Sequence, residues 1–213
     1  LFFSLFFCYL EIEMKRLKIN DIQKMKNKRP IVCITSYTQS ITSIVEKHVD
    51  ILLVGDSLGM TIYGMKNTQS VTLNHMKEHG RTVYNNSSKP FTIIDMPYKT
   101  YTNNKNALTN AKELLNYTKC QSIKLEVNEN HLKLVSYLSE RKINVVSHIG
   151  VKPQEFKDFS KIRIVGKKKS ERNKLINLAL RLEDSGTCIL LLECIDKEAA
   201  KEISSKVRIP TIG

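Results

Sequence analysis

The chain has 213 residues, which is the size of one or two globular domains. Apolar residues make up 41% and charged residues 26%, a composition that excludes a disordered or fibrous protein. The formal net charge is +13, but the two most basic stretches, 14–30 and 161–174, lack interleaved stacking aromatics. We therefore expect a solvated basic surface and no nucleic-acid partner, and keep a nucleic-acid binder or an anionic-ligand site as the alternative.

The first ten residues, LFFSLFFCYL, are apolar but too few to span a bilayer. Their basic neighbours follow the apolar run instead of preceding it, and no small-residue cleavage site comes after them, so a secretory signal is not indicated either. Met14 is a plausible start of translation. We expect residues 1–13 to be a non-native or untranslated extension, residues 14–213 to form one domain, and no membrane partner.

From residue 30 onward, short apolar runs alternate with segments of helical character. The runs show no polar alternation, as expected for parallel strands buried on both faces: Ile31–Ser36, Asp50–Gly55, Phe91–Asp95, Ser122–Glu126, Asn144–His148, Thr187–Glu193 and Ile209–Gly213. The intervening helical segments are Leu73–Tyr84, Asn104–Thr118, His131–Arg141, Glu171–Asp184 and Lys197–Ser205.

This alternation predicts an α/β fold of repeated βα units. About seven strands are present, whereas a TIM (β/α)8-type barrel has eight strands and about 250 residues. We therefore predict such a barrel, incomplete at its C-terminus. A doubly wound open sheet is the alternative, although no G-x-G-x-x-G follows the first run. The longest turn-like stretches, Ser57–Ser70 and Val151–Ser170, both follow strands and should lie at the catalytic face.

Polar side chains stand where successive predicted strands end. They are Asp56 with Ser57, then Asp95, Lys124 with Glu126, His148 and Glu193. In a parallel barrel these ends converge on one rim. Crowded carboxylates repel one another unless a cation joins them, and hard oxygen ligands favour Mg²⁺.

Each of these residues also has a structural reading. Asp56 and Asp95 could cap turns, and Lys124 could form a plain salt bridge with Glu126. His148 alone is more often structural than catalytic, and Glu193 could open a helix. Their joint occurrence at successive strand ends favours a functional site.

These residues lie in strings that resemble the ketopantoate hydroxymethyltransferase family: ILLVGDSLGMTIYG (51–64), QSVTLNHMKEH (69–79), IIDMPY (93–98), IKLE (123–126), HIGVKPQ (148–154), LLLEC (190–194) and IPTIG (209–213). The resemblance runs in order through nearly all of residues 14–213, and VGDSLGM is its most specific part.

The resemblance implies a Mg²⁺-dependent TIM barrel that transfers a hydroxymethyl group from 5,10-methylenetetrahydrofolate to 3-methyl-2-oxobutanoate in pantothenate biosynthesis. It implies that Asp56 and Asp95 bind the metal with Glu126 in its inner or outer shell. It also implies that Asp56, Ser57, Asp95 and Lys124 contact the keto acid, with His148 nearby, and that Glu193 accepts the proton. The family is typically a cytoplasmic homodecamer, and five cysteines without a C-x-x-C pair agree with a reducing compartment.

The chain departs from the family pattern at Thr38, where an aspartate is usual, and at Val127–Asn128, where two glycines are usual. The stretch FSKIRIVGK (159–167) replaces a glycine-rich one. These departures leave the folate contacts unassigned. Two further alternatives remain: a keto-acid carbon–carbon lyase or mutase of the phosphoenolpyruvate mutase/isocitrate lyase group, although its K-K-C-G-H-type loop is absent, and an inactive fragment.

Overall fold

The computed structural model describes residues 15–213, so the predicted extension at residues 1–13 lies outside the described residues. The strands form one parallel sheet in sequential order: β1 (Cys33–Thr35), β2 (Ile51–Val54), β3 (Phe91–Asp95), β4 (Ser122–Glu126), β5 (Val145–Gly150), β6 (Thr187–Glu193) and β7 (Thr211–Ile212). Sequential parallel pairing is the order of a TIM-type barrel and confirms that prediction. A doubly wound sheet would reverse its strand order partway, and this sheet does not.

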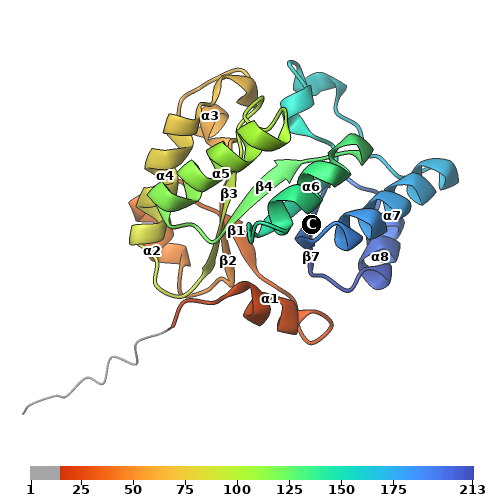
Figure 1. Ribbon diagram of the computed structural model, residues 1–213, viewed down its shortest axis with the longest axis horizontal. Coiled ribbons are helices and arrows are strands. Elements are labelled where there is room, and N and C mark those ends of the chain that lie inside the picture. The colour runs from red at the N-terminus through yellow and green to blue at the C-terminus, as the bar shows by residue number, and fades with distance from the viewer. Residues whose placement is uncertain (1–14) are drawn as a thin grey trace, which may run out of the picture.

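Helices cover the outside of the sheet (Figure 1). They are α1 (Ile19–Met25), α2 (Gln39–Val45), α3 (Leu58–Thr61), α4 (Leu73–Asn85), α5 (Asn104–Thr118), α6 (Leu132–Ser139), α7 (Lys169–Asp184) and α8 (Lys197–Lys206). Residues 15–213 also contain four short 3₁₀ turns: η1 (Thr68–Ser70), η2 (Glu129–His131), η3 (Pro153–Glu155) and η4 (Phe159–Lys161).

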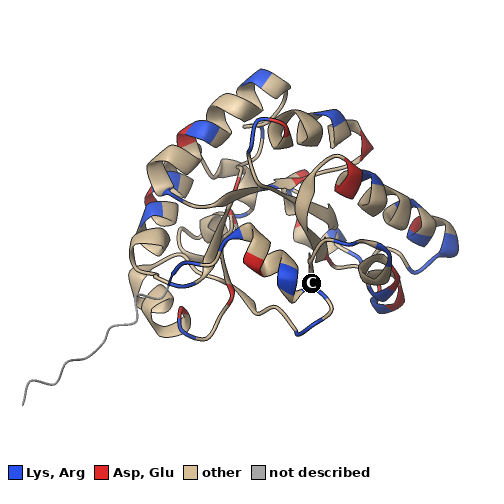
Figure 2. Cartoon of the chain, turned by 60° about the horizontal axis from the view of Figure 1, so that its bottom comes forward, with Lys and Arg blue, Asp and Glu red and all other residues tan. Residues whose placement is uncertain are grey.

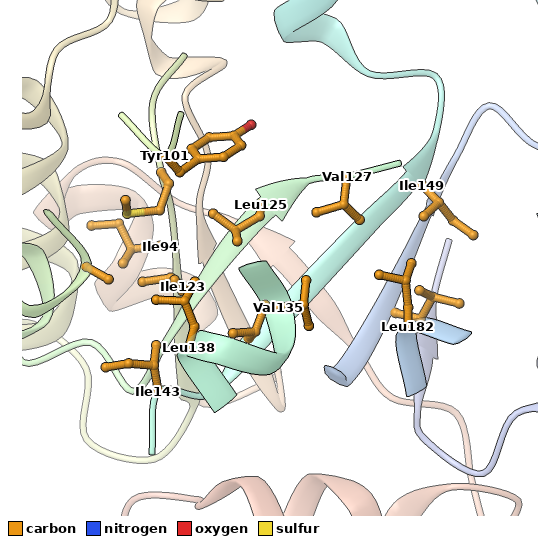
Figure 3. Close-up of a cluster of buried hydrophobic side chains, with 14 of the residues drawn as sticks. Ile94, Tyr101, Ile123, Leu125, Val127, Val135, Leu138, Ile143, Ile149 and Leu182 are labelled. Carbon is orange, nitrogen blue, oxygen red and sulfur yellow. The ribbon is translucent and has the colours of Figure 1, made fainter. Parts of the chain in front are cut away.

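The larger core lies between the strands and the outer helices. Figure 3 shows Ile123, Leu125 and Val127 of the β4 region on the same side as Val135 and Leu138 of α6. Because side chains alternate along a strand, the intervening Lys124 and Glu126 face the other way, into the barrel. The packing of β4 against α6 therefore determines which of its residues reach the interior.

A second apolar cluster fills the bottom of the barrel. Ile51, Phe91 and Ile93 meet there with Ile22 of α1, which is fully buried. Figure 1 shows α1 at the end of the strands opposite α3. Helix α1 therefore closes the amino-terminal end of the barrel and leaves the carboxyl end for the site.

The structure adds elements that the sequence pattern did not predict, namely α1, α2 and α3, the last inside the predicted turn at Ser57–Ser70. The edge strands β1 and β7 are also shorter than the apolar runs that predicted them. Acidic and basic residues are interspersed along the outer helices (Figure 2). None of the helices within residues 15–213 combines the length and apolar character needed to cross a membrane.

Candidate active site

A cavity of about 320 Å³ lies at the carboxyl ends of the strands. It brings together all seven residues singled out in the sequence: Asp56, Ser57, Asp95, Lys124, Glu126, His148 and Glu193. Both long connections contribute to its wall, with Met60 and Thr68 from the loop after β2 and Phe159 and Ile162 from the loop after β5. Its size is that of a pocket for a small ligand.

Strand register explains why these residues meet. Asp95 of β3 is the register partner of Lys124 on β4, and Glu126 is the partner of His148 on β5. Glu193 of β6 pairs in the same way with Gly150. The polar residues thus occupy adjacent strand ends, and each strand presents its own to the same rim.

The Asp95 carboxylate is held by the main chain of Asp56. The Asp56 N–H donates to Asp95 Oδ2 at 3.0 Å. A Cβ at Gly55 would lie only 3.0 Å from the Ser57 hydroxyl, closer than most Cβ contacts, whereas Asp95 Oδ2 at 3.6 Å would be in ordinary contact. The glycine in the V-G-D-S string therefore has a packing reason.

Lys124 lies among the three buried acidic groups of the site. Its Nζ is 3.0 Å from Asp95 Oδ2 and 3.2 Å from His148 Nδ1. The sequence left open a salt bridge with Glu126, but Lys124 pairs with Asp95 instead. Its side chain is 7% exposed, so this is a desolvated ion pair.

Both ring nitrogens of His148 are already engaged by the protein. Nε2 lies 2.8 Å from the carbonyl oxygen of Val151, which can only accept, so Nε2 carries the proton. Nδ1 is then the acceptor that faces the Lys124 ammonium. His148 therefore lines the cavity, and Nδ1 of its ring orients the Lys124 ammonium.

Burial dominates the electrostatics of the carboxyl groups. It raises the pKa of Asp56 to about 7, with a further rise from Asp95 against the lowering effect of Lys124. Burial likewise raises the pKa of Glu126 to about 8 and raises the pKa of Asp95, in both cases opposed by Lys124.

The two basic groups respond in opposite directions. Burial alone would lower the pKa of Lys124, but Asp95, Asp56 and Glu126 outweigh it and raise that pKa above its ordinary value. Burial, followed by the Lys124 charge, lowers the pKa of His148 well below its ordinary value. Three acids around one cation cannot all keep their charge: the raised pKa values relieve the repulsion by proton uptake, and a bound divalent cation would relieve it instead.

The donor set fits such a cation. Asp95 Oδ1 is buried and has no hydrogen-bond partner, so one carboxylate oxygen is free for a ligand. Within residues 15–213, no three His, Cys, Asp or Glu side chains form a ready-made metal cage. One or two carboxylates with water and substrate are the usual protein sites for Mg²⁺, so this arrangement suits it.

Ser57 and Glu193 are the more accessible members of the set, and both are half-buried. The Ser57 hydroxyl shares a hydrogen bond of 2.7 Å with the hydroxyl of Tyr37. Glu193 ends β6, where its own carbonyl accepts from the Val151 N–H at 2.9 Å. The loop after β5 is therefore tied directly to the end of β6.

Sequence reasoning missed Tyr37, Tyr101 and Gln154. Tyr37 contacts Ser57 as described, while Gln154 donates to Asp56 Oδ2 at 2.7 Å. Tyr101 and Gln154 also line a smaller hollow of about 180 Å³, which Glu126 shares with the main cavity. The string HIGVKPQ ends at Gln154 and was the one signal that could have pointed to it.

A parallel α/β barrel with acidic residues, a lysine and a cavity at its carboxyl rim defines the chain as a barrel enzyme. The profile described as "Ketopantoate hydroxymethyltransferase" matches residues 16–213. The chain belongs to the ketopantoate hydroxymethyltransferase family, which confirms the resemblance found in the sequence.

Two relatives are named 3-methyl-2-oxobutanoate hydroxymethyltransferase. The protein of Pelagibacter ubique is 41% identical over 196 residues, which cover 92% of this chain and 75% of that protein. The protein of Campylobacter concisus is 39% identical over 203 residues, which cover 95% of this chain and 75% of that protein.

Solved structures of other enzymes share the fold at low identity. A phosphonopyruvate hydrolase in complex with oxalate and Mg²⁺ has a TM-score of 0.66 at 11% identity, covering 92% of this chain and 71% of that one. A 2,3-dimethylmalate lyase of the PEP mutase/isocitrate lyase superfamily has a TM-score of 0.65 at 14% identity, covering 91% and 70%. These likenesses support the barrel architecture alone.

Proposed function

We propose that the chain transfers a hydroxymethyl group from 5,10-methylenetetrahydrofolate to 3-methyl-2-oxobutanoate, giving 2-dehydropantoate for pantothenate biosynthesis in the cytoplasm. The observation that carries the proposal is one cavity, in a member of this family, that holds Asp56, Asp95, Lys124 and Glu193 together. Family resemblance also favours a homo-oligomer, typically a decamer.

The proposed metal is Mg²⁺, held by Asp56 and Asp95 with Glu126 in its inner or outer shell. The free Oδ1 of Asp95 and the surplus of buried carboxyl groups support this assignment. Bound there, Mg²⁺ would act as a Lewis acid toward the carboxylate and keto oxygens of a 2-oxo acid.

Lys124 and Ser57 bind and orient the keto acid. The Lys124 ammonium has three donor positions, of which Asp95 and His148 use two. The remaining one is available to an oxygen of the substrate carboxylate. Ser57, at the cavity wall, donates a further hydrogen bond while Tyr37 fixes the rotation of its hydroxyl.

Glu193 takes the proton from C3 of the keto acid. The C3–H bond breaks, its electron pair is shared with the keto oxygen, and C3 then bonds to the one-carbon unit of the folate. Both bonds from the one-carbon unit to folate nitrogens break, and water supplies the hydroxyl oxygen of the product. The proton taken by Glu193 and one proton from water end on the two nitrogens of the leaving tetrahydrofolate. Glu193 suits this role because it is half-buried at the rim, whereas Glu126 is buried and held by the protein.

The proposal is tested by measuring 2-dehydropantoate formation from the two substrates, after chelation and again after Mg²⁺ is restored. We expect activity only with Mg²⁺, and calorimetric Mg²⁺ binding in the presence of the keto acid that Asp56→Asn and Asp95→Asn each abolish. Unchanged binding in both variants would reject the metal site. Tight binding of both substrates without any product would favour the alternative that the chain is an inactive fragment.

A further inference from the structure

Gln154 lies in the connection after β5 and contacts residues that end or follow three other strands, β2, β3 and β4. It is 3% exposed, on the short turn η3 that follows β5. Its side-chain Nε2 donates to Asp56 Oδ2 at 2.7 Å and to the Met96 carbonyl at 3.0 Å. Its backbone N–H donates to Glu126 Oε2 at 3.0 Å.

The orientation of the Gln154 amide is fixed by its partners. The Met96 carbonyl can only accept, so the amide nitrogen must face it and Asp56. On the other side, the Tyr101 hydroxyl donates to Gln154 Oε1 at 2.6 Å. Figure 3 shows the Tyr101 ring at the border of the apolar cluster with its hydroxyl pointing away from Leu125. An aromatic side chain anchored in the core thus holds the amide in one of its two orientations.

One residue therefore holds one oxygen of each of two carboxyl groups. Gln154 engages Oδ2 of Asp56, on the β2 side, and Oε2 of Glu126, at the end of β4. Oδ1 of Asp56 is left as the oxygen available to a ligand. We propose that Gln154 is a positioning residue of the metal site, whose amide sets the rotation of the Asp56 carboxylate; this rests on the proposed function.

If Gln154 only held its loop in place, removing another contact that holds this loop should weaken metal binding equally. The loop that carries it is also clamped by Gln69 of η1, whose Nε2 donates to the Gln154 carbonyl at 2.9 Å. That contact anchors the backbone and does not touch the amide. Gln69→Met and Gln154→Met each remove a side-chain hydrogen bond that holds the same loop, but only Gln154→Met frees the Asp56 carboxylate.

The test is the affinity of the purified chain for Mn²⁺ alone, measured from the signal of free Mn²⁺ in electron paramagnetic resonance. Residues that orient a ligand typically change metal affinity about 10- to 100-fold, so we expect the Kd of Gln154→Met to rise by about that factor. Gln69→Met should keep the parental Kd. Tyr101→Phe retains the amide but loses the hydroxyl that fixes it, and should give a smaller rise; it decides the question if Gln154→Met fails to fold.

The outcomes separate the two proposals. A parental Kd in Gln154→Met, or equal weakening in Gln154→Met and Gln69→Met, would overturn the positioning role and leave the metal site standing. A parent protein that does not bind Mn²⁺ would overturn the metal site and the positioning role with it.

Discussion

The Lys124 ammonium and the Asp95 carboxylate form a buried ion pair across the register of β3 and β4, with Nζ 3.0 Å from Oδ2. Removing the cation leaves three buried acids without compensation. We expect Lys124→Met to lower the free energy of unfolding by about 3 kcal/mol, as for other broken buried pairs. Urea unfolding at pH 7 without added metal measures the change.

Lys77→Met is the matched control, because Lys77 pairs with Glu113 at 2.9 Å on the surface, where the Glu113 side chain is 49% exposed. Exposed ion pairs contribute little because water screens both charges, so this variant should be nearly as stable as the parent. Equal losses in the two variants would mean that the Lys124 pair is not the buried electrostatic link described here.

His148 is predicted to remain neutral, with its proton on Nε2, at pH 6. The Val151 carbonyl fixes that tautomer, while burial and then the Lys124 charge lower the pKa of His148. Nitrogen-15 NMR of the imidazole should show a protonated Nε2 and an unprotonated Nδ1. An imidazolium signal at pH 6, or a proton on Nδ1, would contradict the assignment and make His148 a candidate base.

Asp50 should contribute stability that depends on pH. It accepts from Arg29 at 2.8 and 2.7 Å and from the Val32 N–H at 3.0 Å, so it ties the start of β1 to the start of β2. Loss of hydrogen bonds to a charged group typically costs about 1.5–3 kcal/mol, and we expect Asp50→Asn to lose about that amount at pH 7.

The pH dependence follows from the direction of the shift. The hydrogen bonds from Arg29 are the largest cause that lowers the folded-state pKa of Asp50. The unfolded chain therefore takes up the proton first, and the contribution is complete above about pH 4, near the ordinary aspartate pKa. It declines as pH falls through the lowered folded-state pKa. A difference between parent and Asp50→Asn that grew on acidification would contradict this.

The strands with strong signals could be predicted to the residue. Phe91–Asp95, Ser122–Glu126 and Thr187–Glu193 were predicted with the bounds that the structure shows, because each is a buried run that ends in a polar residue. Helix α2 was missed because its sequence, QSITSIV, is rich in β-branched residues of low helix propensity. Its N-cap is Thr38, whose hydroxyl accepts from the Ile41 N–H, so the departure from the usual aspartate keeps a capping residue.

In the site, too, some residues could be predicted from the sequence and others could not. Carboxylates at strand ends could be placed together from the sequence because parallel strands share one rim. Gln154 and Tyr101 could not, since they lie in connections whose path no periodicity defines, and their contacts bring together residues 53 positions apart. Strand ends were therefore predictable, while the groups that orient their side chains required the structure.

Isotope exchange at C3 is the most direct measure of whether Glu193 removes the C3 proton. The exchange of the C3 deuteron of labelled 3-methyl-2-oxobutanoate into water is followed with Mg²⁺ and without folate, so proton removal is measured apart from transfer. Glu193→Gln keeps the shape and removes the basicity, and losing a general base typically costs about 10²–10⁴ in rate. We expect keto-acid binding to persist and exchange to slow by that factor, with parental exchange in the control Glu198→Gln on the exposed face of α8. Exchange at the parental rate in Glu193→Gln would show that Glu193 is not the base.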